Sequence, residues 1–160
     1  GALDEYVIDV EKRLSKPIEN HLINASLKVM TELDEDYQDI EVIQNGLLGY
    51  PENYHYGWLI VSADSFKLLI QANAKIREAK TIHFRFLNDD RHNILPPEKI
   101  WIYKDGEVFA ELSPKDFTAK DNLVEFSLDF DWSAVEEVVV EMVKQKGERV
   151  SMAFDELIVN

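Results

Sequence analysis

Short runs in which apolar and polar residues alternate recur along this sequence, and they restrict the fold more than any other feature. In the run 81–87, Ile82, Phe84 and Phe86 occupy every second position, with polar residues between them. A period of two is the pattern of a β-strand that buries one of its faces. The sequence therefore predicts a fold made mostly of β-strands.

Turn residues separate the chain into about nine expected strands. The runs span residues 27–33, 58–62, 66–71, 81–87, 99–103, 107–112, 122–130, 135–143 and 150–159. Asp105 and Gly106 stand between two runs, and Asp-Gly is a strong signal for a two-residue hairpin turn. The segment 73–80 is too short for more than a turn or a crossing loop. Many short strands with few helices predict an all-β fold, a two-sheet β-sandwich or jelly roll.

The length of 160 residues suits one domain with a sizeable core. We expect a lead-in segment at residues 1–24, either extended or a short helix interrupted by Pro17, followed by a β-sandwich at residues 25–160. The chain begins with Gly1 rather than methionine and carries no recognisable signal peptide. We expect Gly1 to be a cloning remnant and the chain to be trimmed from a longer parent protein.

Composition excludes several classes of function. The formal net charge of −14 disfavours nucleic acids and anionic membrane surfaces, because both attract basic proteins. There are no cysteines, so disulfides, zinc–thiolate sites and thiol catalysis are excluded. No apolar run approaches the ~20 residues that span a bilayer, so we expect no membrane insertion.

The stretch 45–58 is unusually rich in glycine and ring side chains. Three glycines (Gly46, Gly49 and Gly57) and five rings (Tyr50, Tyr54, His55, Tyr56 and Trp58) lie within it. Glycines mark backbone turns, and the rings are crowded where a loop enters a strand. Such a segment either packs a loop onto the core or presents rings to a ligand. We expect Trp58, which opens a strand, to belong to the core.

Sequence patterns for catalysis are weak compared with the stretch 45–58. The acidic clusters 34–36 and 88–90 have the composition of solvated turns, and nothing nearby predicts an apolar pocket that would raise the pKa of one acid. The four histidines lack the spacing of a helical metal site, and no G-x-S-x-G nucleophile turn is present. We therefore expect no enzyme active site within this chain.

The order of motifs resembles that of discoidin-like, galactose-binding-like β-sandwich domains. The matching segments are 45–49 with 53–58, then 66–71, 76–89, 97–102 and the closing Asp155-Glu-Leu-Ile-Val159. The likeness is greatest to accessory domains of bacterial glycoside hydrolases such as β-N-acetylhexosaminidases. This chain departs from the family pattern at two places. In the glycine turn, residues 45–49, Asn45 stands where the family has an aspartate. Gln71-Ala-Asn73 stands where the family has a D-L-G segment.

The resemblance implies a glycan-binding site in the loops at one end of the sandwich. Tyr54, His55 and Tyr56 would cover the apolar face of a sugar. Arg91, His92 and Asn93 would donate and accept hydrogen bonds with its hydroxyl groups. Arg91 would also suit a carboxylated sugar.

The resemblance also implies a structural Ca²⁺ near the glycine turn. Its ligands would come from Asn45, Glu52, Asp155 and Glu156, since calcium takes six to eight oxygen atoms. Asn45 supplies a carbonyl oxygen but no charge. The alternative is that Gly46 and Gly49 only permit backbone conformations with positive φ.

We expect a non-catalytic, carbohydrate-binding accessory domain of a bacterial extracytoplasmic protein, either periplasmic or on the cell surface. Its partner would be a glycan or a neighbouring catalytic domain of the same polypeptide, as in a larger glycoside hydrolase. The alternative is a structural or protein-docking β-sandwich with no glycan ligand, which would offer an apolar patch instead. A glycosidase would need two carboxylates facing each other in a cleft.

Overall fold

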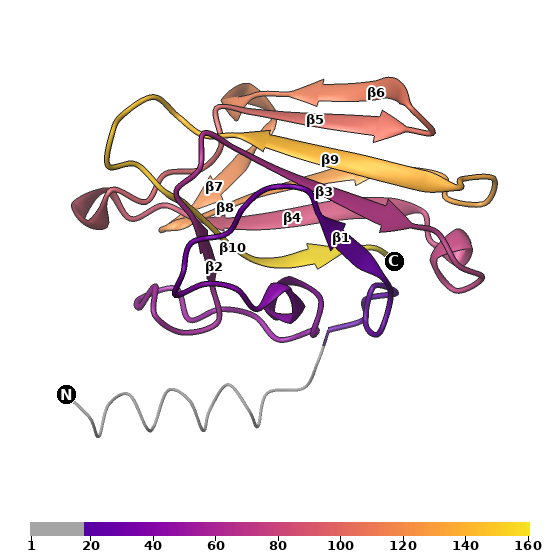
Figure 1. The fold of residues 1–160 in the computed structure, drawn as a ribbon, viewed down its shortest axis with the longest axis horizontal. Helices are drawn as coiled ribbons and strands as arrows, with labels where there is room; N and C mark the ends of the chain where they lie inside the picture. The colour runs from indigo at the N-terminus through magenta and orange to yellow at the C-terminus, as the bar shows by residue number, and fades with distance from the viewer. Residues whose placement is uncertain (1–17) are drawn as a thin grey trace.

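The computed structural model describes residues 18–160, and these form two antiparallel β-sheets packed face to face (Figure 1). Each sheet has five strands. The expectation for residues 1–17 of the lead-in segment lies outside the described residues. No helix within the range 18–160 is long and apolar enough to cross a membrane. The all-β, two-sheet sandwich predicted from the alternating pattern is confirmed.

The first sheet has the strand order β1-β3-β9-β5-β6 and the second has the order β2-β10-β4-β8-β7. The first comprises β1 (Leu27–Val29), β3 (Ser65–Gln71), β9 (Glu137–Val143), β5 (Lys99–Lys104) and β6 (Glu107–Leu112). The second comprises β2 (Leu59–Val61), β10 (Met152–Ile158), β4 (Thr81–Leu87), β8 (Leu123–Asp129) and β7 (Thr118–Lys120). Four short 3₁₀ turns join them: η1 (Ile40–Ile43), η2 (Ile76–Glu78), η3 (Asp90–His92) and η4 (Pro114–Asp116).

Each of the nine expected runs contains a strand, and β7 is an additional one. The hairpin turn is as predicted, because Asp105 and Gly106 have φ values of 48° and 85°, both positive as in a type I′ turn. β1 ends earlier than expected, at Val29. Beyond it the hydroxyl oxygen of Thr31, rather than a backbone carbonyl, accepts the hydrogen bond of the Lys67 N–H, so the ladder stops.

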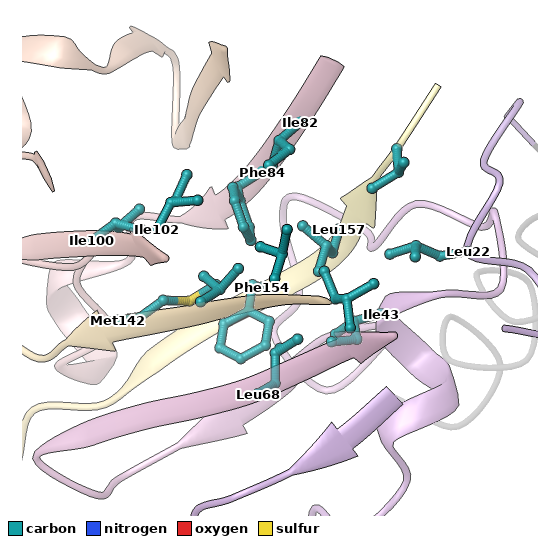
Figure 2. Close-up of a cluster of buried hydrophobic side chains, with 14 of the residues drawn as sticks. Leu22, Ile43, Leu68, Ile82, Phe84, Ile100, Ile102, Met142, Phe154 and Leu157 are labelled. Atoms are coloured by element: carbon teal, nitrogen blue, oxygen red, sulfur yellow. The ribbon is translucent and has the colours of Figure 1, made fainter. Parts of the chain in front are cut away.

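The core fills the space between the two sheets (Figure 2). Phe84 from β4 and Phe154 from β10 meet Leu68 from β3 and Ile102 from β5 in this layer. All four are buried, as the alternating pattern predicted for Phe84. Burying such side chains contributes roughly 1.5–3 kcal/mol each.

Residues 18–24 also contact the sandwich. Leu22 is fully buried in the main core. The amide nitrogen of Asn20 donates to the carbonyl of Leu157, and its amide oxygen accepts from the N–H of Val159. This part of the expected lead-in segment is therefore fastened along β10.

A β-bulge interrupts β10. Phe154 lies opposite Phe86 of β4, yet the next paired residue, Leu157, lies opposite Phe84, so three steps on β10 match two on β4. Phe154 and Leu157 both belong to the core, which strict alternation would not allow. The two residues between them, Asp155 and Glu156, therefore turn away from the core, towards the outer face of the sheet.

Candidate ligand-binding site

Three loops meet at one end of the second sheet. The strand pair β4–β8 places Leu87 opposite Leu123, so the loop that follows β4 and the loop that precedes β8 leave from the same end. The N–H of Asn88 donates to the carbonyl of Asn122, and the side chain of Asn122 donates to the carbonyl of Pro51. These contacts hold the loop 50–57 against the other two.

Ring side chains from two of these loops lie together. The Tyr54 ring centroid is 4.1 Å from that of His55 and 4.8 Å from that of His92. His92 Nδ1 lies 2.8 Å from an Asp89 carboxylate oxygen, which fixes the orientation of the imidazole. The ring cluster, defined as Tyr54, His55 and His92, joins residues from both loops that the sequence nominated for a ligand.

Local hydrogen bonds build the two loops. The side-chain oxygen of Asn53 accepts from the N–H of His55, a turn typical of asparagine. The N–H of Tyr50 donates to the carbonyl of Tyr56, which closes the loop at its base. Asn93 ends η3 in the left-handed conformation, with φ of 58°, a conformation that asparagine tolerates better than most residues. The ring cluster therefore stands on defined turns.

The ring cluster also has an apolar base. Trp58 is 3% exposed and forms a small second core with Ile60, Leu87, Ile94 and Ala153, and Tyr54 packs against it. The Trp58 indole N–H donates to the carbonyl of Tyr50. The expectation that Trp58 belongs to the core is confirmed. A rigid base of this kind holds exposed side chains in a fixed geometry.

An open depression of about 410 Å³ adjoins the ring cluster. Its lining includes Glu35, Asp36, Tyr37, Asp39, His55 and Trp58. Burial raises the pKa of Tyr37, and the nearby Tyr54, Asp36 and Asp34 raise that pKa further. The depression is therefore a negatively charged environment with aromatic walls.

The other nominated ligand contacts lie around the ring cluster rather than in it. Arg91 and Asn93 are exposed on η3 and at its end. Tyr56 is half-buried, and its backbone closes the turn that carries Tyr54.

Sequence reasoning did not nominate Tyr37 or Asp89, because each stands in an acidic segment that has the composition of a solvated turn. Only the spacing of three residues between Asp89 and His92 could have indicated their pairing.

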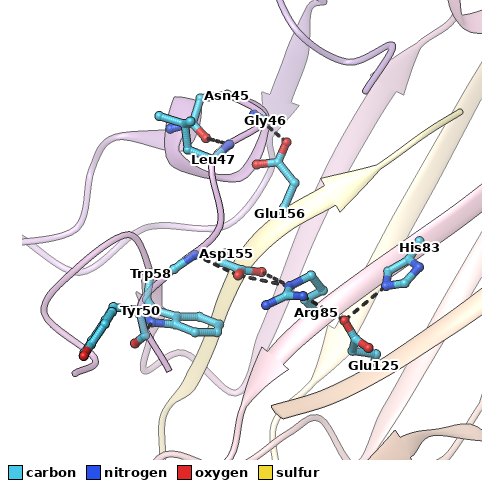
Figure 3. Close-up of polar contacts among 11 residues, drawn as sticks. Asn45, Gly46, Leu47, Tyr50, Trp58, His83, Arg85, Glu125, Asp155 and Glu156 are labelled. Atoms are coloured by element: carbon cyan, nitrogen blue, oxygen red, sulfur yellow. Dashed lines mark hydrogen bonds and ion pairs between the residues drawn. The ribbon is translucent and has the colours of Figure 1, made fainter. Parts of the chain in front are cut away.

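Three of the four nominated calcium ligands each bond a different backbone N–H group (Figure 3). An oxygen of Glu156 accepts from the backbone N–H of Gly46 at 2.7 Å, and an oxygen of Asp155 accepts from the N–H of Gly49 at 2.9 Å. The side-chain oxygen of Asn45 accepts from the N–H of Leu47. Glu52 is exposed beside Asp121 and Asn122.

This donor set does not fit a calcium ion, which requires oxygen atoms on every side. N–H donors face both oxygens of Asp155 and one oxygen of Glu156, and one of these donors is the guanidinium of Arg85. Among residues 18–160, no three His, Asp or Glu side chains are grouped so that they could hold a metal ion. Calcium binding therefore stays a prediction of the resemblance, without support from this geometry.

Comparisons with solved structures define the fold class. A carbohydrate-binding module, CBM51, of a Clostridium perfringens GH95 protein in complex with methyl-galactose superposes with a TM-score of 0.51 at 8% identity. The match covers 91% of this chain and 100% of that one. A structure of the Streptococcus pneumoniae β-galactosidase BgaA superposes with a TM-score of 0.50 at 11% identity, over 85% of this chain and 91% of that one.

The likeness to these two structures confirms the β-sandwich at the level of fold, which is the fold that the resemblance to discoidin-like, galactose-binding-like domains implied. No family model matches the sequence. No curated protein sequence matches it either.

Proposed function

We propose that this chain is a non-catalytic carbohydrate-binding domain that contacts its glycan through the ring cluster. It would serve as an accessory domain of a larger, extracytoplasmic carbohydrate-active protein. Its role there would be to hold that protein at a glycan, or to steady a neighbouring catalytic domain.

The observation that carries this proposal is the meeting of Tyr54, His55 and His92 from two loops at one end of the sandwich. Ring side chains cover the apolar C–H face of a sugar, and imidazole nitrogens bond its hydroxyl groups. His92 is 46% exposed, so its ring is accessible to a ligand. Arg91 and Asn93 lie on the same loop and would add hydrogen bonds at the edge.

The similar structures support the proposal through their own descriptions. One holds methyl-galactose in a module of the same fold, and another comes from a β-galactosidase. Both are parts of carbohydrate-active proteins, which is why we propose the same setting here. A galactose-type sugar is therefore the first ligand to test.

The charge around the ring cluster favours a neutral sugar. Glu35, Asp36 and Asp39 line the adjoining depression, while Arg91 is the one arginine of the loop 88–94. An anionic sugar would meet like charges there, which oppose its approach. This argument goes against the carboxylated sugar that Arg91 alone suggested.

A glycan-array screen followed by calorimetry with methyl galactoside and lactose would test the proposal. We expect wild-type binding, and a loss of several-fold to about tenfold in Tyr54→Ala and in His92→Ala, because an aromatic contact contributes roughly 0.5–1.5 kcal/mol beyond the area it buries. Tyr103→Ala is the matched control, since Tyr103 lies in β5 of the other sheet. A wild type that binds no glycan would contradict the function, whereas retained binding in both variants would contradict only the site.

A docking domain without a glycan ligand is the second candidate, and one observation favours it. Val108 and Phe109 on the edge strand β6 are 58% and 45% exposed. Exposed apolar side chains on the outermost strand of a sheet suit contact with another protein surface. In a longer polypeptide that includes the neighbouring domain, Val108→Glu would then accelerate proteolysis between the two domains. Unchanged proteolysis would remove this candidate.

A further inference from the structure

Asp155 on β10 is a buried carboxylate, and both of its oxygens accept hydrogen bonds. Its side chain is 0% exposed. The Nε of Arg85 lies 3.2 Å from one carboxylate oxygen and 3.1 Å from the other, and the N–H of Gly49 donates to the second at 2.9 Å. A buried carboxylate is stable only when positive charge and hydrogen bonds compensate it. Here the compensating charge comes from within the chain.

Arg85 is held in place from its other side. Its Nη1 donates to an oxygen of Glu125 at 3.0 Å, and the Nε2 of His83 lies 3.6 Å from the same oxygen. The alternating pattern placed His83 and Arg85 on the outer face of β4, but Arg85 is only 13% exposed. The residues His83, Glu125, Arg85 and Asp155 thus run in a line towards the glycine turn (Figure 3).

Glu156, the second acid of β10, also accepts from N–H donors. One oxygen of Glu156 accepts from the Asn20 amide at 2.6 Å and from the N–H of Gly46 at 2.7 Å. A cation bound between the glycine turn and β10 would need these oxygens to face it. Three of the four carboxylate oxygens of Asp155 and Glu156 face N–H groups instead, and the side chain of Asn45 brings no negative charge to the turn.

We infer that the guanidinium of Arg85 takes the place of a structural calcium ion, so that the glycine turn 45–49 is fastened to β10 without metal. The positive charge that neutralises Asp155 is covalently part of β4. Two backbone N–H groups, from Gly46 and Gly49, and the side-chain amide of Asn20 supply the other hydrogen bonds to the acids. The loop that carries Tyr54 and His55 is therefore positioned in the absence of calcium.

Thermal unfolding of the whole chain tests this inference independently of glycan binding. After treatment with a chelator, we expect the same Tm with added millimolar CaCl₂ as with excess EDTA. Terbium luminescence, sensitised by Trp58 beside Gly49, should show no saturable site. A saturable rise in Tm with CaCl₂ that Asp155→Asn abolishes would overturn the inference.

Variants of the pair supply the second part of the experiment. We expect Arg85→Met to lower Tm by roughly 10 °C, because it leaves a buried carboxylate uncompensated. Adding Asp155→Asn to that variant should recover part of the loss, since the carboxylate charge is then also removed. Arg91→Met is the matched control and should leave Tm unchanged, because Arg91 is exposed. An Arg85→Met variant as stable as that control would overturn the inference.

Discussion

Asp155 and Glu156 are adjacent in the sequence, yet both side chains reach the same glycine turn. The β-bulge between Phe154 and Leu157 makes this possible, because it turns two successive residues of β10 away from the core. Asp155 bonds the N–H of Gly49 and Glu156 bonds that of Gly46. One irregularity in one strand thus fastens the loop that carries Tyr54 and His55.

Glu156→Gln should destabilise the fold by about 2 kcal/mol, since two buried hydrogen bonds lose their charge assistance. The glutamine oxygen can still accept from Asn20 and Gly46, because both bonds go to a single oxygen, but it carries no negative charge. Urea unfolding followed by circular dichroism measures the change. Glu148→Gln, an exposed position, is the matched control and should stay within about 0.5 kcal/mol of wild type. Equal stability of the two variants would contradict the fastening role of Glu156.

Gly49→Ala should cost about 2 kcal/mol through steric overlap. A Cβ atom at residue 49 would lie 2.6 Å from Nε1 of the Trp58 indole, closer than real contacts allow. Gly106→Ala is the informative comparison, because that Cβ would meet nothing within 4 Å and only the positive φ of 85° opposes it. We expect about 1 kcal/mol there. The unfolding free energies of both variants check the argument, and a milder effect at residue 49 than at residue 106 would contradict it.

The strands were predictable because their signals are local. Alternation in 81–87 identified β4 and its inward phenylalanines, and Asp105-Gly106 identified the hairpin between β5 and β6. β7 was missed because Thr118–Lys120 is short and exposed, so it has no apolar face to mark it. Strict alternation would also place Asp155 or Glu156 in the core, and only pairing with β4 reveals the bulge.

The ring cluster was predictable in its parts and not in its assembly. Tyr54 and His92 were nominated from separate loops, and the resemblance placed both loops at one end of the sandwich. Their contact depends on the pairing of β4 with β8 and on the bond from Asn122 to the carbonyl of Pro51. Such long-range contacts leave no periodic trace in a sequence. For the same reason nothing local indicated that Arg85 would meet Asp155, 70 residues away.

If the ring cluster binds a glycan, lactose should bind more tightly than sialyllactose by about tenfold or more, because acids surround the site. Asp36→Asn should narrow this difference, since Asp36 lines the depression beside His55. Asp129→Asn removes the same charge at the far end of β8 and should leave the ratio unchanged. Calorimetry at low ionic strength measures both ratios. Tighter binding of the sialylated sugar would show that Arg91 dominates the site instead.

Tyr37 should titrate at a higher pH than an ordinary tyrosine, because burial, Tyr54 and the neighbouring acids all raise its pKa above 10.0. The folded state then keeps a proton that the unfolded state releases, so stability should fall as the pH rises above about 10. Tyr37→Phe lacks this proton and should lose less stability over that range. Subtracting the ultraviolet titration of Tyr37→Phe from that of the wild type isolates this one residue among six tyrosines. Asp36→Asn should shift the isolated titration to lower pH, whereas an unshifted curve would mean that the acidic loop does not act on the ring.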